Sequence, residues 1–332
     1  MSRASATESG RETFGAAAFS ELRRRLATVP GVVPATADPP ASHGRADEAR
    51  IVPAELIEPP PLRAQAVGPP SSWPGPVAFL DGTQRHEVVA YAGPMPLVAA
   101  EVAAAVRERV GRQARTVHSR RRQLLIGRPE ALALAVVGLP GVQTVALAAD
   151  EPPHPLRDLE LARAAVDRAR GELELLAGDA YRRTAGHWLV VDGSLAESPA
   201  WAADPRMLGI AKSHASLPFG GTEMVTYLHL PAGHRSSVFR PSSRRQAPVY
   251  AWGLRLWDWT GKDLFFGLIR VEAAPTEETL RMADSISRWL LAERSPLSAD
   301  PRWDRLLYGI HGVEEYLRSG GGSRNGQRVD EK

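Results

Sequence analysis

The chain has 332 residues, of which 43% are hydrophobic and 24% are charged, and its 41 Lys and Arg against 38 Asp and Glu leave a formal net charge of +3. This composition is typical of a folded globular protein and excludes a wholly disordered chain. The sequence has no cysteine, which excludes disulfides, a thiolate nucleophile and a cysteine zinc site, so any bound metal would have carboxylate or histidine ligands. No stretch approaches the about 18 apolar residues of a membrane span, and the first residues lack the apolar core of a signal peptide, so we expect a soluble, cytoplasmic protein.

Residues 1–76 are expected to form a helix followed by an extended arm. Residues 12–28 carry apolar side chains at mostly helical spacing. The following Pro-rich stretch includes Pro59, Pro60 and Pro61 in a row, which neither a helix nor a central strand accommodates. Residues 319–332 lack the apolar content needed for burial and are expected to form a flexible tail. The folded domain is therefore expected to span residues 77–318.

That domain alternates predicted strands and helices. The predicted strands are 77–80 and 87–91, joined as a hairpin, then 188–191, 224–230, 249–258 and 264–272. The predicted helices are 98–115, 159–176 and 277–293. Such alternation predicts an α/β domain with a sheet covered by helices.

Two of the apolar strands end in the same short motif. Asp81-Gly82-Thr83 follows the first predicted strand, and Asp192-Gly193-Ser194 follows the strand 188–191. If these strands are neighbours their carboxylates converge, and paired carboxylates are costly unless a cation neutralises them. Mg²⁺ and Mn²⁺ are the cations that suit an all-oxygen ligand set. The alternative for either site alone is an ordinary turn, because Asp-Gly is a common turn dipeptide.

The helix before Asp192 offers a third carboxylate, from Glu172 or Glu174. The apolar stripe of this helix includes Val166, Ala169, Leu173 and Leu176. At about 100° per residue, Glu172 lies nearer the edge of that stripe than Glu174 does, so we expect Glu172 to be the ligand and keep Glu174 as the alternative. A solvated carboxylate on the helix surface is the other interpretation of either residue.

Lys212 follows the second motif within Gly209-Ile210-Ala211-Lys212-Ser213-His214. A compact ammonium beside a metal site can hold a scissile phosphate or stabilise negative charge in the transition state. The competing interpretation is a surface charge. His214, like most single histidines, is expected to be an incidental polar residue.

The order and spacing of these motifs resemble those of the NurA family of nucleases. The resemblance rests on Phe79–Thr83, a Glu-bearing helix, Leu189–Leu195 and Gly209–Lys212, and on Gly267–Glu272, which is similar to a strand in which bacterial members carry an Arg-x-Glu pattern. It spans about residues 77 to 318, which is most of the expected folded domain.

The resemblance implies an RNase H-like fold, a mixed sheet flanked by helices, and a nuclease that uses two Mn²⁺ or Mg²⁺ ions to hydrolyse phosphodiester bonds at DNA ends. It implies that Asp81, Asp192 and either Glu172 or Glu174 bind the metal ions, and we assign Lys212 to the same catalytic site. It also implies a homodimer that works beneath a hexameric HerA-type ATPase translocase.

One segment departs from the family pattern. Archaeal members tend to end in a Tyr-Pro segment followed by a His or Asp that helps to bind metal, whereas the matching stretch here has Tyr308, no Pro, and an early His311. His311, Glu314 or Glu315 is therefore the candidate for a further ligand. The departure also supports an alternative function, a catalytically inactive DNA-binding or adaptor subunit of a translocase complex.

Basic and aromatic residues are candidates for contact with DNA. The first Arg cluster consists of Arg112, Arg115, Arg120, Arg121 and Arg122, and the second of Arg235, Arg240, Arg244 and Arg245. Together they predict a basic channel for phosphates, although a charge run can also be a solvated face. Trp257 and Trp259 alternate on one strand face and could stack on bases, but we favour a core or dimer-interface position, which is commoner for aromatic residues at strand spacing.

Overall fold

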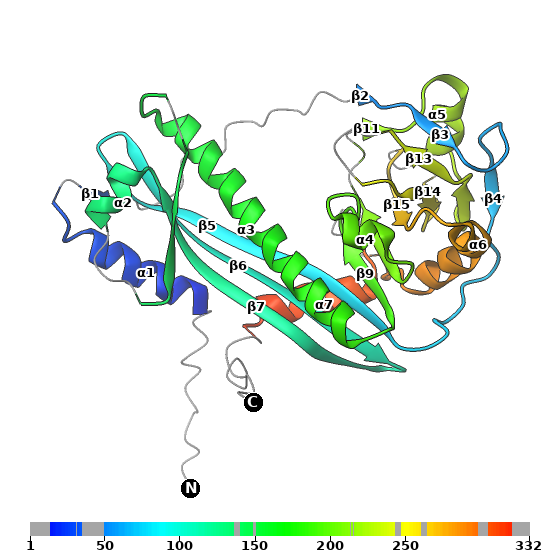
Figure 1. Cartoon of the computed structure of the whole chain (residues 1–332), viewed down its shortest axis with the longest axis horizontal. Helices are drawn as coiled ribbons and strands as arrows, with labels where there is room; N and C mark the ends of the chain where they lie inside the picture. Colours follow the sequence, from blue (N-terminus) through cyan, green and yellow to red (C-terminus); the bar gives the residue numbers. More distant parts are fainter. Residues whose placement is uncertain are drawn as a thin grey trace, which may run out of the picture.

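One large mixed sheet runs through the molecule and is flanked by helices (Figure 1). The computed structural model describes residues 14–30, 32–34, 50–135, 140–148, 151–212, 214, 216–242, 247–259, 264–297 and 305–320. Within these ranges the strand order is β3-β13-β14-β15-β10-β9-β5-β6-β7-β8, with β1, β4 and β12 attached beside this path. The pairs β9–β5, β10–β9 and β7–β8 are parallel, and the other pairs along the path are antiparallel. The predicted α/β class is confirmed.

The elements have the following bounds. The strands are β1 (Val32–Pro34), β2 (Arg50–Ile51), β3 (Ala54–Leu56), β4 (Ala64–Ala66), β5 (Val77–Ala92), β6 (Met95–Val110), β7 (Gln113–Gly127), β8 (Val142–Ala146), β9 (Trp188–Asp192), β10 (Met207–Ala211), β11 (Ser216–Leu217), β12 (His234–Ser236), β13 (Phe239–Pro241), β14 (Tyr250–Arg255) and β15 (Leu268–Ala273). The helices are α1 (Phe14–Leu26), α2 (Pro129–Ala135), α3 (Pro155–Thr184), α4 (Pro199–Ala203), α5 (Gly221–Leu228), α6 (Glu277–Ala292) and α7 (Tyr308–Arg318).

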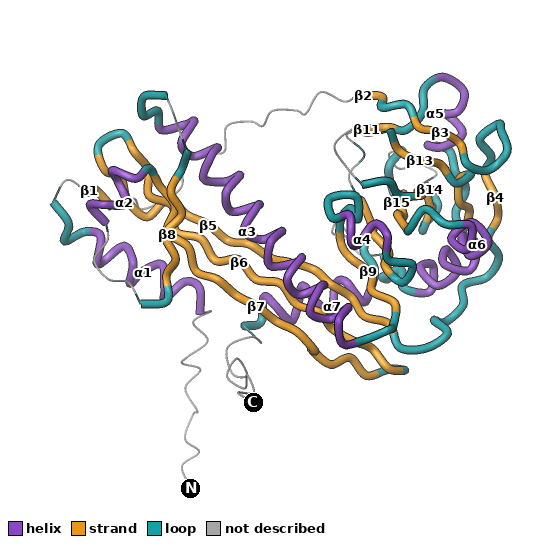
Figure 2. Tube along the Cα trace, viewed as in Figure 1, coloured by secondary structure: helices purple, strands orange, loops and turns teal. Residues whose placement is uncertain are grey.

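Strands β5, β6 and β7 form a long antiparallel ribbon with a helix on each face. Side chains alternate between the two faces of a strand, so Leu80 packs in one core cluster with α3 while its neighbour Phe79 packs in another with α7. The long helix α3 lies along the ribbon (Figure 2). α1 closes a third cluster against the far end of the ribbon through Phe19 and Leu26. The sheet is thus covered on both sides where β5 meets β9.

The expected hairpin at 77–91 is wrong, because these residues form the single strand β5. β5 pairs with β6 along its length, and Asp81 and Gly82 lie opposite Ala105 and Ala104 in the ladder. The chain reverses only beyond Ala92, where Gly93 adopts a positive φ of 57°. Asp81-Gly82 therefore marks a position inside a strand and not a turn.

Two further element assignments are wrong. Residues 98–115 were expected to be helical but lie mostly in β6, because apolar residues four apart satisfy the two-residue period of a strand as well as that of a helix. β6 is also buried on both faces, so its pattern lacks polar alternation. Residues 224–230 were expected to be a strand but mostly form α5, in which Tyr227 and Leu228 are the buried positions.

The second half of the chain completes the sheet around β9 and β10. β15 and β14 follow β10, and α6 covers them through Ile286 and Leu290. Part of the Pro-rich arm joins the same sheet, since β3 pairs with β13 and β4 with β12. Within the described ranges, no helix is both long and apolar enough to cross a lipid bilayer.

Candidate functional site

The two Asp-Gly motifs lie side by side. β5 and β9 are parallel neighbours with Leu80 opposite Val191, so Asp81 and Asp192 are the next residues on adjacent strands. Asp81 is only 8% exposed, and the backbone N–H of Gly82 donates to its Oδ1 at 2.7 Å. β9 ends at Asp192, whereas β5 continues past Asp81. Asp81 and Asp192 are therefore neighbours at the point where β9 ends and β5 continues.

Two carboxyl groups of this site have strongly raised pKa values. Burial, and next the charge of Asp192, raise the pKa of Asp81 to about 8, against the opposing effect of Lys212. Burial also raises the pKa of Glu174 to about 7, with a further contribution from Asp192 and an opposing one from Arg170. At neutral pH Asp81 is therefore mostly protonated and Glu174 partly so, unless a cation compensates their charge.

The helix contributes Glu174 to the site and not Glu172. A Cβ atom on Gly82 would overlap Glu174 Oε1 and lie 2.9 Å from its Cδ, so the Glu174 carboxylate lies directly against Gly82. Arg170, one turn earlier on α3, donates to Glu174. Glu172 instead pairs with Arg122 at 3.1 Å, and its side chain is 63% exposed.

The reason lies in the orientation of α3. Leu176 was expected to belong to the apolar stripe of this helix, but it is 41% exposed. Gly178 and Tyr181 are buried instead, which moves the buried face toward the side of the helix that carries Glu174. The expectation that Glu172 faces the site therefore does not match its position in the fold.

Lys212 lies at the site. It follows the last residue of β10, and its Nζ is 2.8 Å from Oδ2 of Asp192. The side chains are 26% and 25% exposed, respectively, so this ion pair is partly shielded from water. The same ammonium also lowers the pKa of Asp81, so the positive charge of Lys212 acts on both aspartates.

The turn after Asp192 is held by a buried carboxylate from another strand. Oε2 of Glu272 on β15 accepts from Ser194 Oγ at 2.7 Å and from the Leu195 N–H at 3.0 Å. Arg270 donates to the other oxygen of Glu272 from 3.1 and 3.0 Å. Glu272 was not among the predicted site residues, although it belongs to the Arg-x-Glu pattern of this strand.

The C-terminal candidates lie on α7. His311 has Nε2 3.3 Å from Glu315 and Nδ1 3.9 Å from Glu314, and Glu315 is 68% exposed. Tyr308, in the first turn of the same helix, is exposed. The charged groups that most affect the pKa of Asp81 come instead from β9, α3 and the end of β10.

The donor set suits a hard divalent cation. Asp81, Glu174 and Asp192 offer only carboxylate oxygens, the ligands that Mg²⁺ and Mn²⁺ prefer. The raised pKa values of Asp81 and Glu174 show that burial and nearby negative charge outweigh the effect of the cations beside these two groups. Among the described residues, no three His, Asp or Glu are close enough to form a ready-made metal site, and Lys212 and Arg170 hold two of these carboxylates in ion pairs. The residues fit the ion chemically, and binding would require them to move closer together.

The first Arg cluster follows the outer strand β7. Arg121 pairs with Glu101 and donates to the Leu317 carbonyl, while Arg122 pairs with Glu172. Arg120 is exposed. Burial, and next the charges of Arg120 and Arg183, lower the pKa of His118. These contacts place Arg121 and Arg122 on opposite faces of the sheet, so a single channel through the cluster is not evident.

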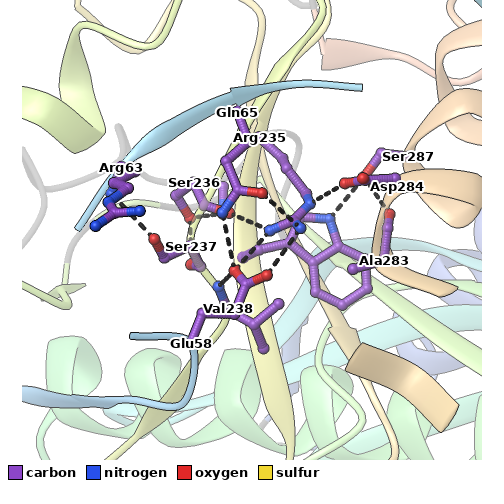
Figure 3. A network of polar contacts seen from close by, with 12 residues as sticks. Glu58, Arg63, Gln65, Arg235, Ser236, Ser237, Val238, Ala283, Asp284 and Ser287 are labelled. Carbon is purple, nitrogen blue, oxygen red and sulfur yellow. Dashed lines mark hydrogen bonds and ion pairs between the residues drawn. The ribbon is translucent and has the colours of Figure 1, made fainter. Parts of the chain in front are cut away.

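The second cluster is divided. Arg235 is 3% exposed, and its guanidinium contacts Glu58, Gln65 and Asp284 (Figure 3). The expectation that it contacts phosphate is therefore wrong. This network ties the arm to β12 and α6 and leaves the guanidinium no surface for a ligand. Arg240 pairs with Glu55 at 3.0 Å. Arg244 and Arg245 lie outside the described residues.

The two tryptophans expected at strand spacing have ring partners within the chain. Arg294 lies over the Trp257 ring at 4.1 Å. Trp259 stacks on His229 with ring centroids 4.9 Å apart, and Arg255 lies over it at 5.9 Å. Both tryptophans follow the end of β14 at Arg255, so the expected placement on one strand face is wrong. The choice between packing and base stacking stays a prediction.

Comparison with known proteins finds a likeness among solved structures. No protein-family model matches the chain, and no curated protein matches it. Among solved structures, the NurA nuclease from Sulfolobus solfataricus is similar, with a TM-score of 0.46 and 10% identity over 75% of this chain and 80% of that one.

Proposed function

We propose that this chain is a divalent-metal-dependent DNA nuclease whose site is built from Asp81, Glu174 and Asp192. The observation that supports this most is the electrostatic coupling of Asp81, Glu174 and Asp192 near the end of β9, where the pKa of Asp81 is raised to about 8 and that of Glu174 to about 7. Crowded acids at such a point cost stability, and groups perturbed by burial and a like charge are typical of functional sites. A scaffold alone would be served better by apolar side chains.

The residues divide into ligands and charge stabilisers. Asp81 and Asp192 would hold Mn²⁺ or Mg²⁺, and Glu174 would complete the set from α3. When bound, such ions supply an activated water and neutralise charge on the phosphate, with two ions sharing these tasks in the commonest arrangement. Lys212, already 2.8 Å from Asp192, is placed to stabilise negative charge that develops on the phosphate oxygens.

The order of the sequence motifs is our reason for proposing DNA as the substrate. It resembles the NurA family, and on that resemblance we also propose an RNase H-like arrangement of the sheet, action on DNA ends, a homodimer and a HerA-type ATPase partner. None of these features is needed for the carboxylate argument, which depends on the positions of Asp81, Glu174 and Asp192 alone.

The test compares two glutamates on one helix. Purified protein is incubated with end-labelled single- and double-stranded DNA in Mn²⁺, Mg²⁺ or EDTA. We expect metal-dependent products, a loss of at least about 100-fold in Asp81→Asn and Glu174→Gln, and a change within about twofold in Glu172→Gln, because only the first two remove a ligand. Equal loss in Glu172→Gln and Glu174→Gln, or full cleavage in Asp81→Asn, would refute the assignment.

The ion pairs of Asp192 and Glu174 favour a second candidate function, that of a non-catalytic subunit. Lys212 and Arg170 already form ion pairs with Asp192 and Glu174 without any metal, which is the arrangement expected of a non-catalytic DNA-binding or adaptor subunit. Such a subunit would keep its DNA affinity in EDTA and in the Asp81→Asn/Asp192→Asn double variant. It would also release no product when an ATPase partner is supplied.

A further inference from the structure

The turn that follows Asp192, residues 193–196, is held by several hydrogen bonds to neighbouring strands and within itself. The Gly193 N–H donates to the Ile210 carbonyl at 3.0 Å, and the N–H of Ala196 donates to Ser194 Oγ at 3.1 Å. Gly193 adopts a φ of 139°, which only glycine tolerates readily. The backbone that directly follows the carboxylate is therefore held in one conformation.

A buried acid provides the central contact of this turn. Glu272 is 2% exposed, and its Oε2 accepts from both the Ser194 hydroxyl and the Leu195 N–H. Arg270 compensates the charge through the other oxygen. A buried carboxylate that accepts two bonds from a neighbouring loop resists displacement, because a shift would leave its charge without donors.

A glycine on the intervening strand allows this contact. Gly209 on β10 lies opposite Glu272, and a Cβ atom there would come within 2.8 Å of the Gly193 carbonyl oxygen and 3.0 Å of the Leu195 N. The turn after Asp192 can therefore pack down on β10 and reach β15. Three separate parts of the sequence converge to fix one turn.

We propose that Glu272 is a positioning residue that acts through Ser194 and Leu195 to fix Asp192 for cation binding. This inference rests on the proposed function, since it gives Asp192 the role of a metal ligand. Glu272 itself touches neither substrate nor metal. Its contribution is to hold the backbone of the turn so that the Asp192 carboxylate faces Asp81 and does not swing away with a loose loop.

The variants perturb the turn from two sides. Ser194→Ala removes one hydrogen bond to Glu272 and leaves the buried ion pair with Arg270 intact. Gly209→Ala pushes the turn away from β10. The matched control is Ser198→Ala, which removes the hydroxyl that accepts from the Trp201 N–H at the start of α4, four residues along the same loop.

Two measurements separate the inference from the proposed function. Mn²⁺ affinity is measured by titration of MnCl₂ followed by electron paramagnetic resonance, and amide hydrogen exchange is measured on peptides that contain residues 192–196. We expect Ser194→Ala and Gly209→Ala to bind Mn²⁺ about 10-fold more weakly, as is usual when an outer-shell partner of a ligand is lost, and to exchange faster in the turn. Ser198→Ala should bind Mn²⁺ as the unaltered chain does. Higher MnCl₂ concentrations should restore cleavage by Ser194→Ala, which an unfolded site would not allow.

The outcomes are distinct. If the unaltered chain binds Mn²⁺ and both turn variants bind it equally well, Glu272 does not position Asp192 and the inference is overturned. If turn exchange is unchanged in Ser194→Ala, the inference is overturned whatever the metal result. If the turn exchange rises as expected but the unaltered chain binds no Mn²⁺, the proposed function fails and the role of Asp192 as a ligand fails with it.

Discussion

Replacing Asp81 with Asn should stabilise the fold at neutral pH while it removes a proposed metal ligand. Asn keeps an oxygen that can accept the Gly82 N–H at the same position. It also replaces an acid whose pKa is raised to about 8 by burial and by Asp192 with a neutral amide. The variant thus removes the electrostatic cost of the site without creating a cavity.

The sign and size of the effect follow from proton linkage. The unfolded chain loses the Asp81 proton near pH 4, whereas the folded chain keeps it up to about pH 8. Because the folded state binds more protons in this window, its free energy of unfolding falls as pH rises, by at most about 1.4 kcal/mol per pH unit. Asp81→Asn has no such proton, so its advantage should grow by up to about 3 kcal/mol between pH 5 and pH 7.

The assay is urea unfolding at several pH values from 5 to 8, in EDTA, with Asp167→Asn as a control for an exposed carboxylate of α3 that contacts Gln84. A second series replaces EDTA with MnCl₂. In this series the unaltered chain should regain stability at the higher pH values, because Mn²⁺ that binds the folded state shifts the unfolding equilibrium. Asp81→Asn should show no such recovery. A stability difference that stays flat or shrinks from pH 5 to pH 8 would refute the raised pKa and, with it, the electrostatic argument for the site.

The remaining predictions concern one side chain each. Gly82→Ala should expel the Glu174 carboxylate and lower cleavage at least about 10-fold in the end-labelled DNA assay, with no effect if Glu174 lies elsewhere in solution. His214, whose pKa burial lowers to about 4, should make stability fall as pH drops from about 6.5 to 4, and His214→Phe should remove up to about 1.4 kcal/mol per pH unit of that slope in urea unfolding. Trp257→Ala and Trp259→Ala should lower the free energy of unfolding and leave the affinity for labelled single-stranded DNA unchanged by fluorescence anisotropy, whereas base stacking would cost affinity.

Part of this fold could be predicted from local pattern. The helices at 14–26, 155–184 and 277–292 carry one-sided apolar stripes, and the strand 188–192 is a short apolar run, so each was predicted close to its position. The ribbon could not be predicted in the same way. Apolar residues four apart in β6 fit both a helix and a strand buried on both faces, and only the partners on either side decide between them.

The candidate site was predictable in its aspartates and not in its glutamate. Asp81 and Asp192 carry the same local motif, so their convergence needed only the assumption that two apolar strands are neighbours. Choosing between Glu172 and Glu174 required the orientation of α3, which depends on the exposure of Leu176 and the burial of Tyr181. The few apolar residues of α3 that the sequence shows do not fix where the centre of its buried face lies, so they cannot decide between the two glutamates.

The Asp-Gly motif on β5 serves the site through both of its residues. Gly82 does not turn the chain, since β5 continues to Ala92 in register with β6. Its lack of a Cβ atom leaves the space that the Glu174 carboxylate occupies. Because β9 ends at Asp192, the sheet is interrupted on the other side of Asp81. The absence of a Cβ atom at Gly82 therefore lets a carboxylate from α3 approach β5 near the end of β9, where it and Asp192 both raise the pKa of Asp81. This explains why glycine at position 82 belongs to the candidate site and not to a turn.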